Sequence, residues 1–486
     1  MNREALSLLR GIWKRCSDLL EQAGPLAETE LKVLEGEVLT YLGEEENLER
    51  AGELLEKSIE EASDLHPEDE FERWRRQVLL AEVYNVLGYY YRNLGQFRKA
   101  VEAYRRAVAQ WRLLEEGEKD RLRRMALRAQ HANTLNNLSW ALAEQGHLAE
   151  AAHFCEDALE MRVALGPAAP VALSLNTYGL ILVRDDKPHR AQVLTGRALG
   201  IFRGLDYPRG IGLSSIALAE ALRRMSAVEY LYAPEEKADL LRRAEQHASD
   251  AVEIFSGPQM RERSRLVEAL IERGCVYRQW AWLWPQYESS EDPDQDELAR
   301  RAEADLKRAM EEAGEGMAYR RLDAHVDLAW LYYYMRQYKQ AEKEARAAIA
   351  SVPEEYRFGK GRSDAQQLPH SFYWLLLGKT YLLLGETAMR QFEYEGRKEE
   401  KYLRRGGLYY TLGLAYDEFY APDFRDLRRA IYRIYIRIRR LNEGEFASLH
   451  KGIREAVEVC GKSPTRMDRL LAERNLPVRA EVEWML

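Results

Sequence analysis

The chain has 486 residues, more than the roughly 250–300 that one compact hydrophobic core can serve. Charged residues make up 31% of it and hydrophobic residues 46%, which excludes an intrinsically disordered chain. The formal net charge of −8 has the wrong sign for a dedicated nucleic-acid coat, and no run approaches the ~18 consecutive apolar residues of a membrane span.

The four cysteines lie far apart and form no Cys-x-x-Cys pair: Cys16, Cys155, Cys275 and Cys460. A disulfide framework and a zinc site are therefore not expected, and a reducing cytoplasm fits best. Charges interrupt the N-terminal sequence every few residues, which favours an amphipathic helix over a signal peptide. We expect a cytoplasmic protein that does not enter a membrane.

Residues 1–76 are predicted to form an N-terminal helical cap with one degenerate repeat, which includes Gly36 and Ala51. In the first clear repeat a large residue precedes a Leu-Gly pair by three positions, an aromatic residue follows, and small residues return after a turn: Tyr84, Leu87, Gly88, Tyr91, Ala100 and Ala107. This spacing resembles the signature of the tetratricopeptide repeat.

The pattern returns clearly at about residues 133–166, 175–198, 325–353 and 374–385, and more weakly at about 210–256 and 266–312. Small residues let paired helices approach, and one pair cannot bury its apolar face alone, so pairs stack. As the resemblance implies, we expect an all-α fold: an α-solenoid, wound as a right-handed superhelix, of about eight helical hairpins. The solenoid is predicted to span residues 77–390, and residues 391–486 to form a helical C-terminal extension.

Within residues 133–166, the sequences TLNNLSWALAEQG and ALEMRVALG also resemble the longer repeats of kinesin light chain and its bacterial relatives. This resemblance implies a protein-binding groove. In bacterial relatives it implies the sensor part of a signalling or defence assembly, or a receptor for peptide pheromones. The N-terminus shows no clear DNA-binding helix-turn-helix, which argues against the receptor version.

In such repeats the first helix of each hairpin lines the concave face, and stacking aligns equivalent residues. Asn85, Asn136 and Asn176 occupy the same place, directly after the large residue that opens the pattern. Because an amide offers both a donor and an acceptor, this row is predicted to hydrogen-bond the main chain of an extended peptide. The alternative is that these amides satisfy contacts between helices.

Tyr89 and Trp140 lie one helical turn beyond the first two asparagines, and Arg92 and Asn93 lie one turn beyond Tyr89. A net hydrogen bond contributes only about 0.5–1.5 kcal/mol, whereas micromolar affinity needs about −8 kcal/mol. The two aromatic side chains are therefore predicted to be apolar anchors for a partner. The alternative places Trp140 in the core.

Three tryptophans at alternating positions, Trp280, Trp282 and Trp284, precede an acidic loop at residues 288–297. They cannot all share one face of a helix. They are read either as a second docking site or as local packing of an elongated hairpin. The loop lacks the glycine that a calcium-binding loop requires, so a solvated acidic loop is expected.

Four arginines are spread over a predicted amphipathic helix in the C-terminal extension: Arg425, Arg429, Arg433 and Arg437. Such a helix can contact phosphate or an acidic partner, which makes nucleic-acid binding at residues 425–440 the runner-up function. The acidic balance of the whole chain disfavours it. The alternative is a packed helix with a solvated charged face.

No catalytic constellation is found. Gly378-Lys379-Thr380 imitates the end of a phosphate-binding loop, but the residues before it are apolar and helical, so ATP binding is rejected. No catalytic residue, metal ligand or cofactor is predicted, and an enzyme is not expected. The leading interpretation is an adaptor or sensor that holds a peptide or protein partner in the groove, as part of a hetero-oligomer.

Overall fold

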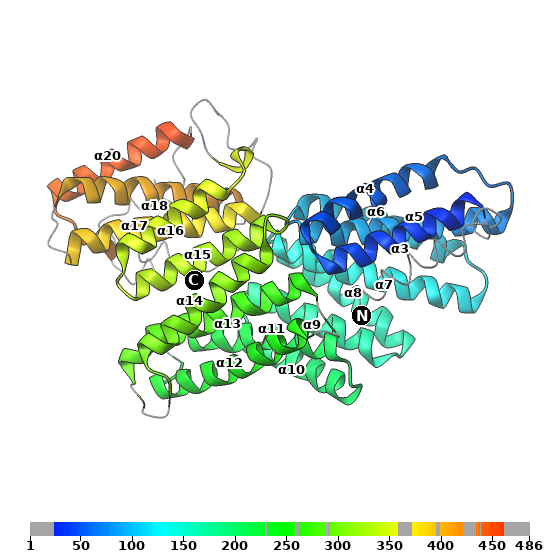
Figure 1. Ribbon diagram of the computed structural model, residues 1–486, viewed down its shortest axis with the longest axis horizontal. Coiled ribbons are helices and arrows are strands. Elements are labelled where there is room, and N and C mark those ends of the chain that lie inside the picture. Colours follow the sequence, from blue (N-terminus) through cyan, green and yellow to red (C-terminus); the bar gives the residue numbers. More distant parts are fainter. Residues whose placement is uncertain are drawn as a thin grey trace. The chain divides into compact units, whose positions relative to one another are not determined.

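The computed structural model describes residues 24–228, 231–257, 262–287, 292–357, 372–394, 399–420 and 439–460, with isolated residues 260, 289, 434, 436 and 437. Within these residues the chain is helical and contains no strand (Figure 1). The all-α prediction is therefore confirmed.

The described helices form eight consecutive hairpins, the number predicted: α3 (Pro25–Leu42) with α4 (Glu45–Asp64), α5 (Glu70–Asn93) with α6 (Phe97–Gly117), α7 (Arg121–Glu144) with α8 (Leu148–Leu165), α9 (Ala168–Arg184) with α10 (Pro188–Gly204), α11 (Pro208–Ser226) with α12 (Pro234–Ser256), α13 (Arg263–Leu283) with α14 (Gln295–Ala313), α15 (Ala318–Tyr334) with α16 (Tyr338–Ser351), and α17 (Phe372–Tyr394) with α18 (Glu400–Tyr420). Two 3-10 helices, η1 (Trp284–Gln286) and η2 (Glu354–Tyr356), and a final helix α20 (Glu443–Cys460) complete the described elements.

The chain divides into two compact units. The N-terminal unit comprises Met1–Tyr287 and Arg308–Arg320, and the C-terminal unit comprises Glu288–Lys307 and Arg321–Leu486. The division of the sequence into a solenoid at residues 77–390 and an extension at residues 391–486 stays a prediction.

Small residues at the helix crossings let the two helices of a hairpin approach closely, as the repeat pattern requires. A Cβ atom on Gly88 would lie 2.5 Å from the Tyr104 ring, and one on Gly179 would lie 2.3 Å from the Thr195 methyl group. The alanines of the second helices are fully buried at the same crossings: Ala51, Ala100, Ala107, Ala151, Ala158, Ala191, Ala198, Ala244 and Ala251. Larger side chains at these places would separate the helices.

The turns within several hairpins share one geometry. Two residues after the first helix ends, the backbone takes a left-handed conformation, at Gly95 (φ 72°) in one hairpin and at Gly146 (φ 81°) in the next. The following N–H then donates to a carbonyl five residues back, which satisfies the end of the helix. Asp186 (φ 56°) and Arg336 (φ 58°) take the same conformation without being glycine.

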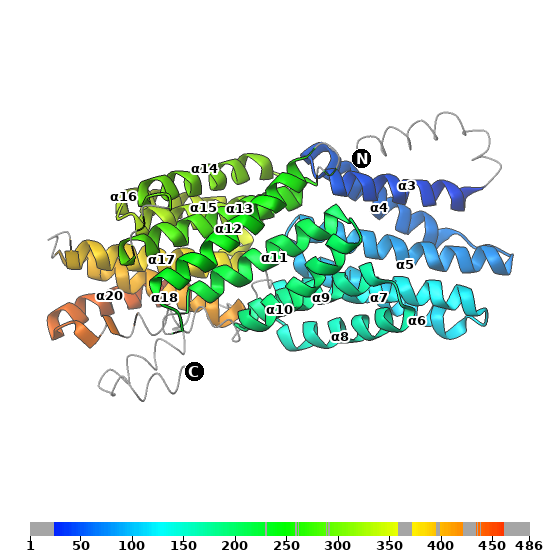
Figure 2. The ribbon, with the colours of Figure 1, turned by 90° about the horizontal axis from the view of Figure 1, so that it is seen from below.

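In the N-terminal unit the first helices of successive hairpins, α5, α7, α9 and α11, contact one another in order (Figure 2). The chain then returns to its start. A Cβ on Gly43 would lie 3.5 Å from the Arg263 Cβ, and one on Gly316 would lie 3.1 Å from Leu48. We call these contacts, between residues 262–265 and 313–320 on one side and α3–α5 on the other, the seam.

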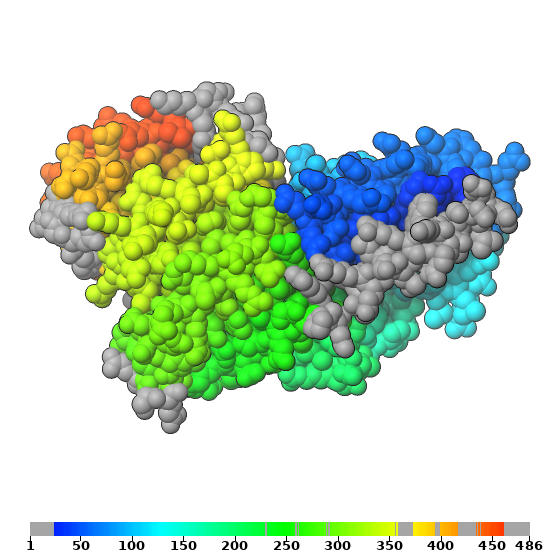
Figure 3. All heavy atoms as spheres, viewed as in Figure 1, coloured from blue at the N-terminus to red at the C-terminus, as the bar shows by residue number. Residues whose placement is uncertain are grey.

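The C-terminal unit contains a buried glutamate, Glu386, surrounded by polar partners. Glu386 accepts hydrogen bonds from the hydroxyl groups of Tyr333 and Tyr410, both at 3.0 Å, and pairs with Arg437 at 3.0 Å. α20 lies on the outside of this unit, where it packs along α18 (Figure 3). The two helices meet through Gly407 and Gly452, whose Cβ positions are occupied by backbone atoms of the opposite helix.

Candidate functional site

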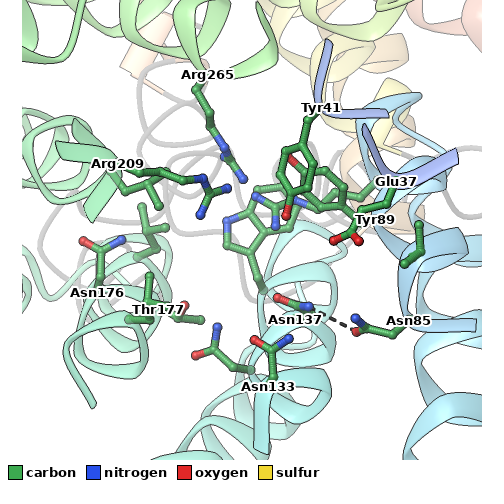
Figure 4. A pocket seen from close by; sticks show the side chains of 17 residues that line it. Glu37, Tyr41, Asn85, Tyr89, Asn133, Asn137, Asn176, Thr177, Arg209 and Arg265 are labelled. Carbon is green, nitrogen blue, oxygen red and sulfur yellow. Dashed lines mark hydrogen bonds between the residues drawn. The ribbon is translucent and has the colours of Figure 1, made fainter. Parts of the chain in front are cut away.

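A cavity of about 150 Å³ lies on the inner face of the N-terminal unit (Figure 4). Every residue that lines it belongs to the first helix of a hairpin: Glu37 and Tyr41 on α3; Asn85, Val86, Tyr89 and Arg92 on α5; Asn133, Asn136, Asn137 and Trp140 on α7; Leu173, Asn176, Thr177 and Leu180 on α9; Arg209 and Leu213 on α11; and Arg265 on α13. The inner face is therefore built as the repeat pattern indicates, with equivalent positions of successive hairpins side by side.

Asparagines form one wall of the cavity, from α5, α7 and α9. Within it, the Asn137 amide donates to the Asn85 side-chain oxygen at 3.2 Å, and the Asn133 oxygen accepts from Arg162 at 3.2 Å. These three side chains are thus fixed by neighbours inside the protein, and Asn85, Asn133 and Asn137 meet at one edge of the cavity in Figure 4.

Two other asparagines of this wall have side-chain oxygens without a hydrogen-bond donor in the described part of the chain. Asn136 is 8% exposed and Asn176 is 6% exposed, yet neither side-chain oxygen has a hydrogen-bond donor among the described residues. A buried acceptor without a donor costs about 1–3 kcal/mol. Because neither amide is held by the protein, rotation about its Cβ–Cγ bond can offer a donor or an acceptor to a ligand.

Arginine side chains, held by buried carboxylates, form the side of the cavity opposite the asparagine wall. Glu262 immediately precedes α13, and its carboxylate is almost fully buried. It accepts hydrogen bonds from Arg209 Nε at 2.8 Å and from the Tyr89 hydroxyl at 2.9 Å. Burial opposes its charge, but the Arg209 guanidinium holds the pKa of Glu262 below its usual value. One carboxylate thus joins α5, α11 and α13 across the cavity.

A second carboxylate supports the same side. Glu268 pairs with Arg265 at 2.5 Å and with Arg320 at 3.2 Å. Burial opposes ionisation, but the two guanidinium groups hold the pKa of Glu268 at about 2.

The lowered pKa of Glu268 predicts how the free energy of unfolding changes with pH. An unfolded glutamate titrates near a pKa of about 4.3, so the folded protein binds the proton less tightly, and Glu268 stabilises the fold above that pH. Its contribution of about 3 kcal/mol is expected to be lost as the pH falls from about 5 to about 2. Urea unfolding at several pH values checks this, since the Glu268→Gln variant should lose correspondingly less. Equal losses in both proteins would contradict it.

Arg92 and Trp140 form the floor between these two sides. The guanidinium carbon of Arg92 lies 3.4 Å from the centroid of the Trp140 ring, and both side chains are buried. Burial, together with the nearby charge of Arg265, lowers the pKa of Arg92 to about 10. No carboxylate of the described residues lies within ion-pair distance of this cation.

α3 provides the last part of the lining. Tyr41 stacks at a tilt on Tyr89, with ring centroids 5.0 Å apart, and the Arg209 guanidinium lies 5.6 Å from the Tyr41 centroid. Glu37 faces the cavity from the same helix, and burial raises its pKa. The lining therefore combines amides, guanidinium groups and aromatic rings with few carboxylates.

The structure brings together six of the seven residues predicted to contact a partner: Asn85, Tyr89, Arg92, Asn136, Trp140 and Asn176. Asn93 is the exception, because its amide donates to the Thr40 carbonyl oxygen at 3.3 Å, outside the cavity lining. Trp140 lines the cavity and is only 5% exposed, so it belongs to the core, as the alternative interpretation states, and its role as an anchor for a partner stays a prediction. Binding by these residues stays a prediction.

Sequence reasoning missed Arg209, Arg265, Glu37 and Tyr41. The two arginines lie in the first turns of α11 and α13, before the apolar residues that reveal each repeat. The other two lie in the degenerate first repeat, where no large residue marks the register. Asn133 and Asn137 could have been found, because both lie within one helical turn of Asn136.

The three tryptophans predicted as a possible second docking site differ in how far they are buried. Trp280 is buried and donates to the Tyr287 hydroxyl, and Trp284 meets the same ring edge-on with centroids 5.3 Å apart. Trp282 is 41% exposed. Two of the three rings therefore pack locally, which favours the hairpin interpretation, and a docking role for this group stays a prediction.

Of the four arginines predicted as a second interface, Arg425, Arg429 and Arg433 lie outside the described residues. Arg437 is largely buried and pairs with Glu386 at 3.0 Å and with Glu393 at 3.7 Å. Its charge thus serves the interior of the C-terminal unit.

The described part of the chain offers little for other kinds of chemistry. Burial raises the pKa of the Cys155 thiol to about 12, so it is a poor nucleophile at neutral pH. The described residues contain no group of three or more side chains suited to hold a metal ion, and no helix among them is long and apolar enough to cross a membrane. Gly378, Lys379 and Thr380 lie inside α17, as their rejection as a phosphate loop assumed.

Comparison with known proteins gives both family and structural matches. A family model described as Tetratricopeptide repeat matches residues 131–168, and a second of the same description matches residues 81–109. No curated protein matches the chain.

Several solved structures are similar at low identity. A Rap protein complexed with Competence and Sporulation Factor aligns over 93% of this chain and 100% of its own, with 14% identity and a TM-score of 0.48. The apo form of RapI aligns over 89% and 97%, with 13% identity and a TM-score of 0.43. BtubC from P. vanneervenii aligns over 55% and 90%, with 23% identity and a TM-score of 0.33.

Proposed function

We propose that this chain, which contains tetratricopeptide repeats, is a non-catalytic adaptor or sensor that binds an extended peptide segment of a partner protein in the cavity of its N-terminal unit. A bacterial signalling or defence setting in the cytoplasm is part of the proposal and rests on the sequence resemblance alone. Pairing with a partner subunit would make the assembly a hetero-oligomer.

The observation that carries the proposal is the pair of uncommitted amides, Asn136 and Asn176, on the wall of the cavity. The main chain of an extended peptide offers an N–H and a C=O at every residue, which is the complement of a side-chain amide. Equivalent positions of α7 and α9 present these amides in succession, so they can contact successive parts of one strand.

The size of the cavity limits what it holds. Sites for whole drug-sized ligands measure about 300–1,000 Å³, whereas a space of about 150 Å³ accepts a group the size of benzene. We infer that one residue of the peptide enters the cavity, and that Trp140 and the neighbouring leucines provide its apolar contact.

The test is the double variant Asn136→Leu and Asn176→Leu in the full chain. Replacing two buried acceptors that lack donors should leave the free energy of unfolding unchanged or raise it, by up to about 1–3 kcal/mol for each. The variant should no longer capture the peptides that the wild-type protein selects from a phage-displayed random peptide library. Calorimetric titration with the selected peptides gives the affinities.

Asn93→Leu is the matched control. It removes an equally buried asparagine that is not part of the lining and leaves the Thr40 carbonyl without its donor, so it should lower stability and keep peptide capture. Wild-type affinity in the double variant would refute the proposal. Trp140→Ala is a poorer test, because truncating this buried ring costs about 3–5 kcal/mol of stability.

A further inference from the structure

The cations around the cavity outnumber the carboxylates that pair with them. Of the lining arginines, Arg209 pairs with Glu262, and Arg265 pairs with Glu268 at 2.5 Å and with Glu262 at 3.5 Å. Arg92 adds a third positive charge to the lining and is 7% exposed. Glu268 attracts it, but no carboxylate of the described residues lies within ion-pair distance of it. An uncompensated buried charge is costly, which is why buried cations are normally paired.

We propose that the cavity anchors a carboxylate of the bound peptide on Arg92, with Arg265 as the second cation beside it. This inference rests on the proposed function, because it names the residue that the bound peptide places in the cavity. An acidic side chain or a terminal carboxylate would give Arg92 a carboxylate at ion-pair distance, which none of the described residues provides.

The geometry of Arg92 suits this role. Its guanidinium carbon lies 3.4 Å from the centroid of the Trp140 ring, a contact that restricts the group, and a guanidinium stacked on a ring can still donate hydrogen bonds from its N–H edges. A guanidinium binds a carboxylate with two parallel N–H···O bonds, and such charged bonds are about twice as strong as neutral ones. Arg209 is less available than Arg92, because Glu262 already accepts from two of its nitrogen atoms.

The amide wall specifies what lies next to the carboxylate. Asn136 is on the same helix as Trp140, one turn away, so its free amide is close to the proposed anchor. A peptide that places an acidic group on Arg92 can direct its adjacent main-chain N–H and C=O groups to Asn136 and Asn176. The ligand class is therefore a peptide with one acidic anchor and an extended backbone beside it.

Glu37 is a carboxylate in the lining and works against the anchor. It faces the cavity from α3, and like charges in one small cavity repel. Burial already raises the pKa of Glu37. Its neutral variant, Glu37→Gln, should therefore strengthen the binding of acidic peptides and leave neutral peptides unaffected.

The experiment uses the full chain and two synthetic hexapeptide libraries. The first is acetylated and amidated at its ends, so its only carboxylates are those of Asp and Glu. The second has a free C-terminus. Wild-type protein should prefer an acid over its amide, Asp over Asn or Glu over Gln, by about 10- to 100-fold at one position, as expected for a charged hydrogen bond. Selection from the second library alone would identify a terminal carboxylate as the source, and the anchor would stand.

Arg92→Met keeps an apolar chain on Trp140 and removes the charge. It should abolish the preference for the acid without lowering the melting temperature, because it also removes an uncompensated buried cation. Arg92→Lys keeps the charge and should keep a weaker preference. As a control, Arg184→Met removes a cation that pairs with Glu144 and Glu220 outside the lining, so it should lower the melting temperature and keep the preference.

Two kinds of result would overturn the inference, and they differ in whether the proposed peptide-binding function survives. Peptide capture with equal affinity for acids and amides, or an acid preference that survives in Arg92→Met, removes the anchor and leaves the proposed function. No capture from either library removes both.

Discussion

Glu262→Gln is expected to lower the free energy of unfolding of the N-terminal unit by about 3–5 kcal/mol, the cost of leaving a buried cation without its partner. Glu262 joins three helices through Arg209, Tyr89 and Arg265, and its side chain is 3% exposed. Glutamine has one acceptor oxygen where the carboxylate has two, so it can serve neither the charge nor the whole set of donors.

Urea unfolding followed by circular dichroism measures this effect. Glu150→Gln is the control, because Glu150 pairs with Arg105 on the surface, where the side chains are 39% and 54% exposed. An exposed ion pair contributes about 0–1 kcal/mol, so this variant should be nearly neutral. If the two glutamate variants unfold at the same urea concentration, Glu262 does not hold the seam.

Gly452→Ala is expected to destabilise the packing of α20 by about 3 kcal/mol or more, at the upper end of the cost of overfilling a core. The new Cβ atom would lie 1.8 Å from the Arg404 carbonyl oxygen and 2.7 Å from the Leu408 nitrogen, both in the backbone of α18. A side chain could rotate away from such a contact, whereas a helix backbone must move as a whole. The better helix propensity of alanine, about 1 kcal/mol, offsets only part of this cost.

Hydrogen exchange of the α20 amides tests this expectation, because a helix that separates from α18 loses its protection. Gly444→Ala is the matched control on the same helix. The nearest atom to its Cβ would be the Asn442 side-chain oxygen at 3.6 Å, an ordinary contact, so this variant should keep or gain protection. Unchanged exchange in Gly452→Ala would mean that α20 does not depend on this crossing.

Local signals explain which parts of the fold could be predicted. A glycine or alanine at a helix crossing is required wherever two helices meet within one hairpin, so Gly88 and Ala100 identify their repeat without any other part of the chain. The row of Asn85, Asn136 and Asn176 follows from the same register. These predictions depend on contacts between residues that are close in sequence.

The rest of the candidate site depends on contacts that no local pattern encodes. Tyr89 is bonded to Glu262, 173 residues away, and nothing in the sequence around either residue indicates the other. Asn93 illustrates the converse. It lies beside Arg92 in the sequence, yet successive helical residues point about 100° apart, which directs its amide to Thr40 and away from the cavity.

The seam also fixes the number of hairpins in the N-terminal unit. In an open array each repeat meets only its neighbours, so hairpins can be gained or lost at either end with little effect on the others. Here five hairpins precede α13, which contacts α3 and α5. An additional hairpin inserted before α13 would move Glu262 away from Tyr89 and Arg209. The inner lining can therefore change one residue at a time without disturbing the seam, whereas a change in the number of hairpins would break the contacts of Glu262 with Tyr89 and Arg209.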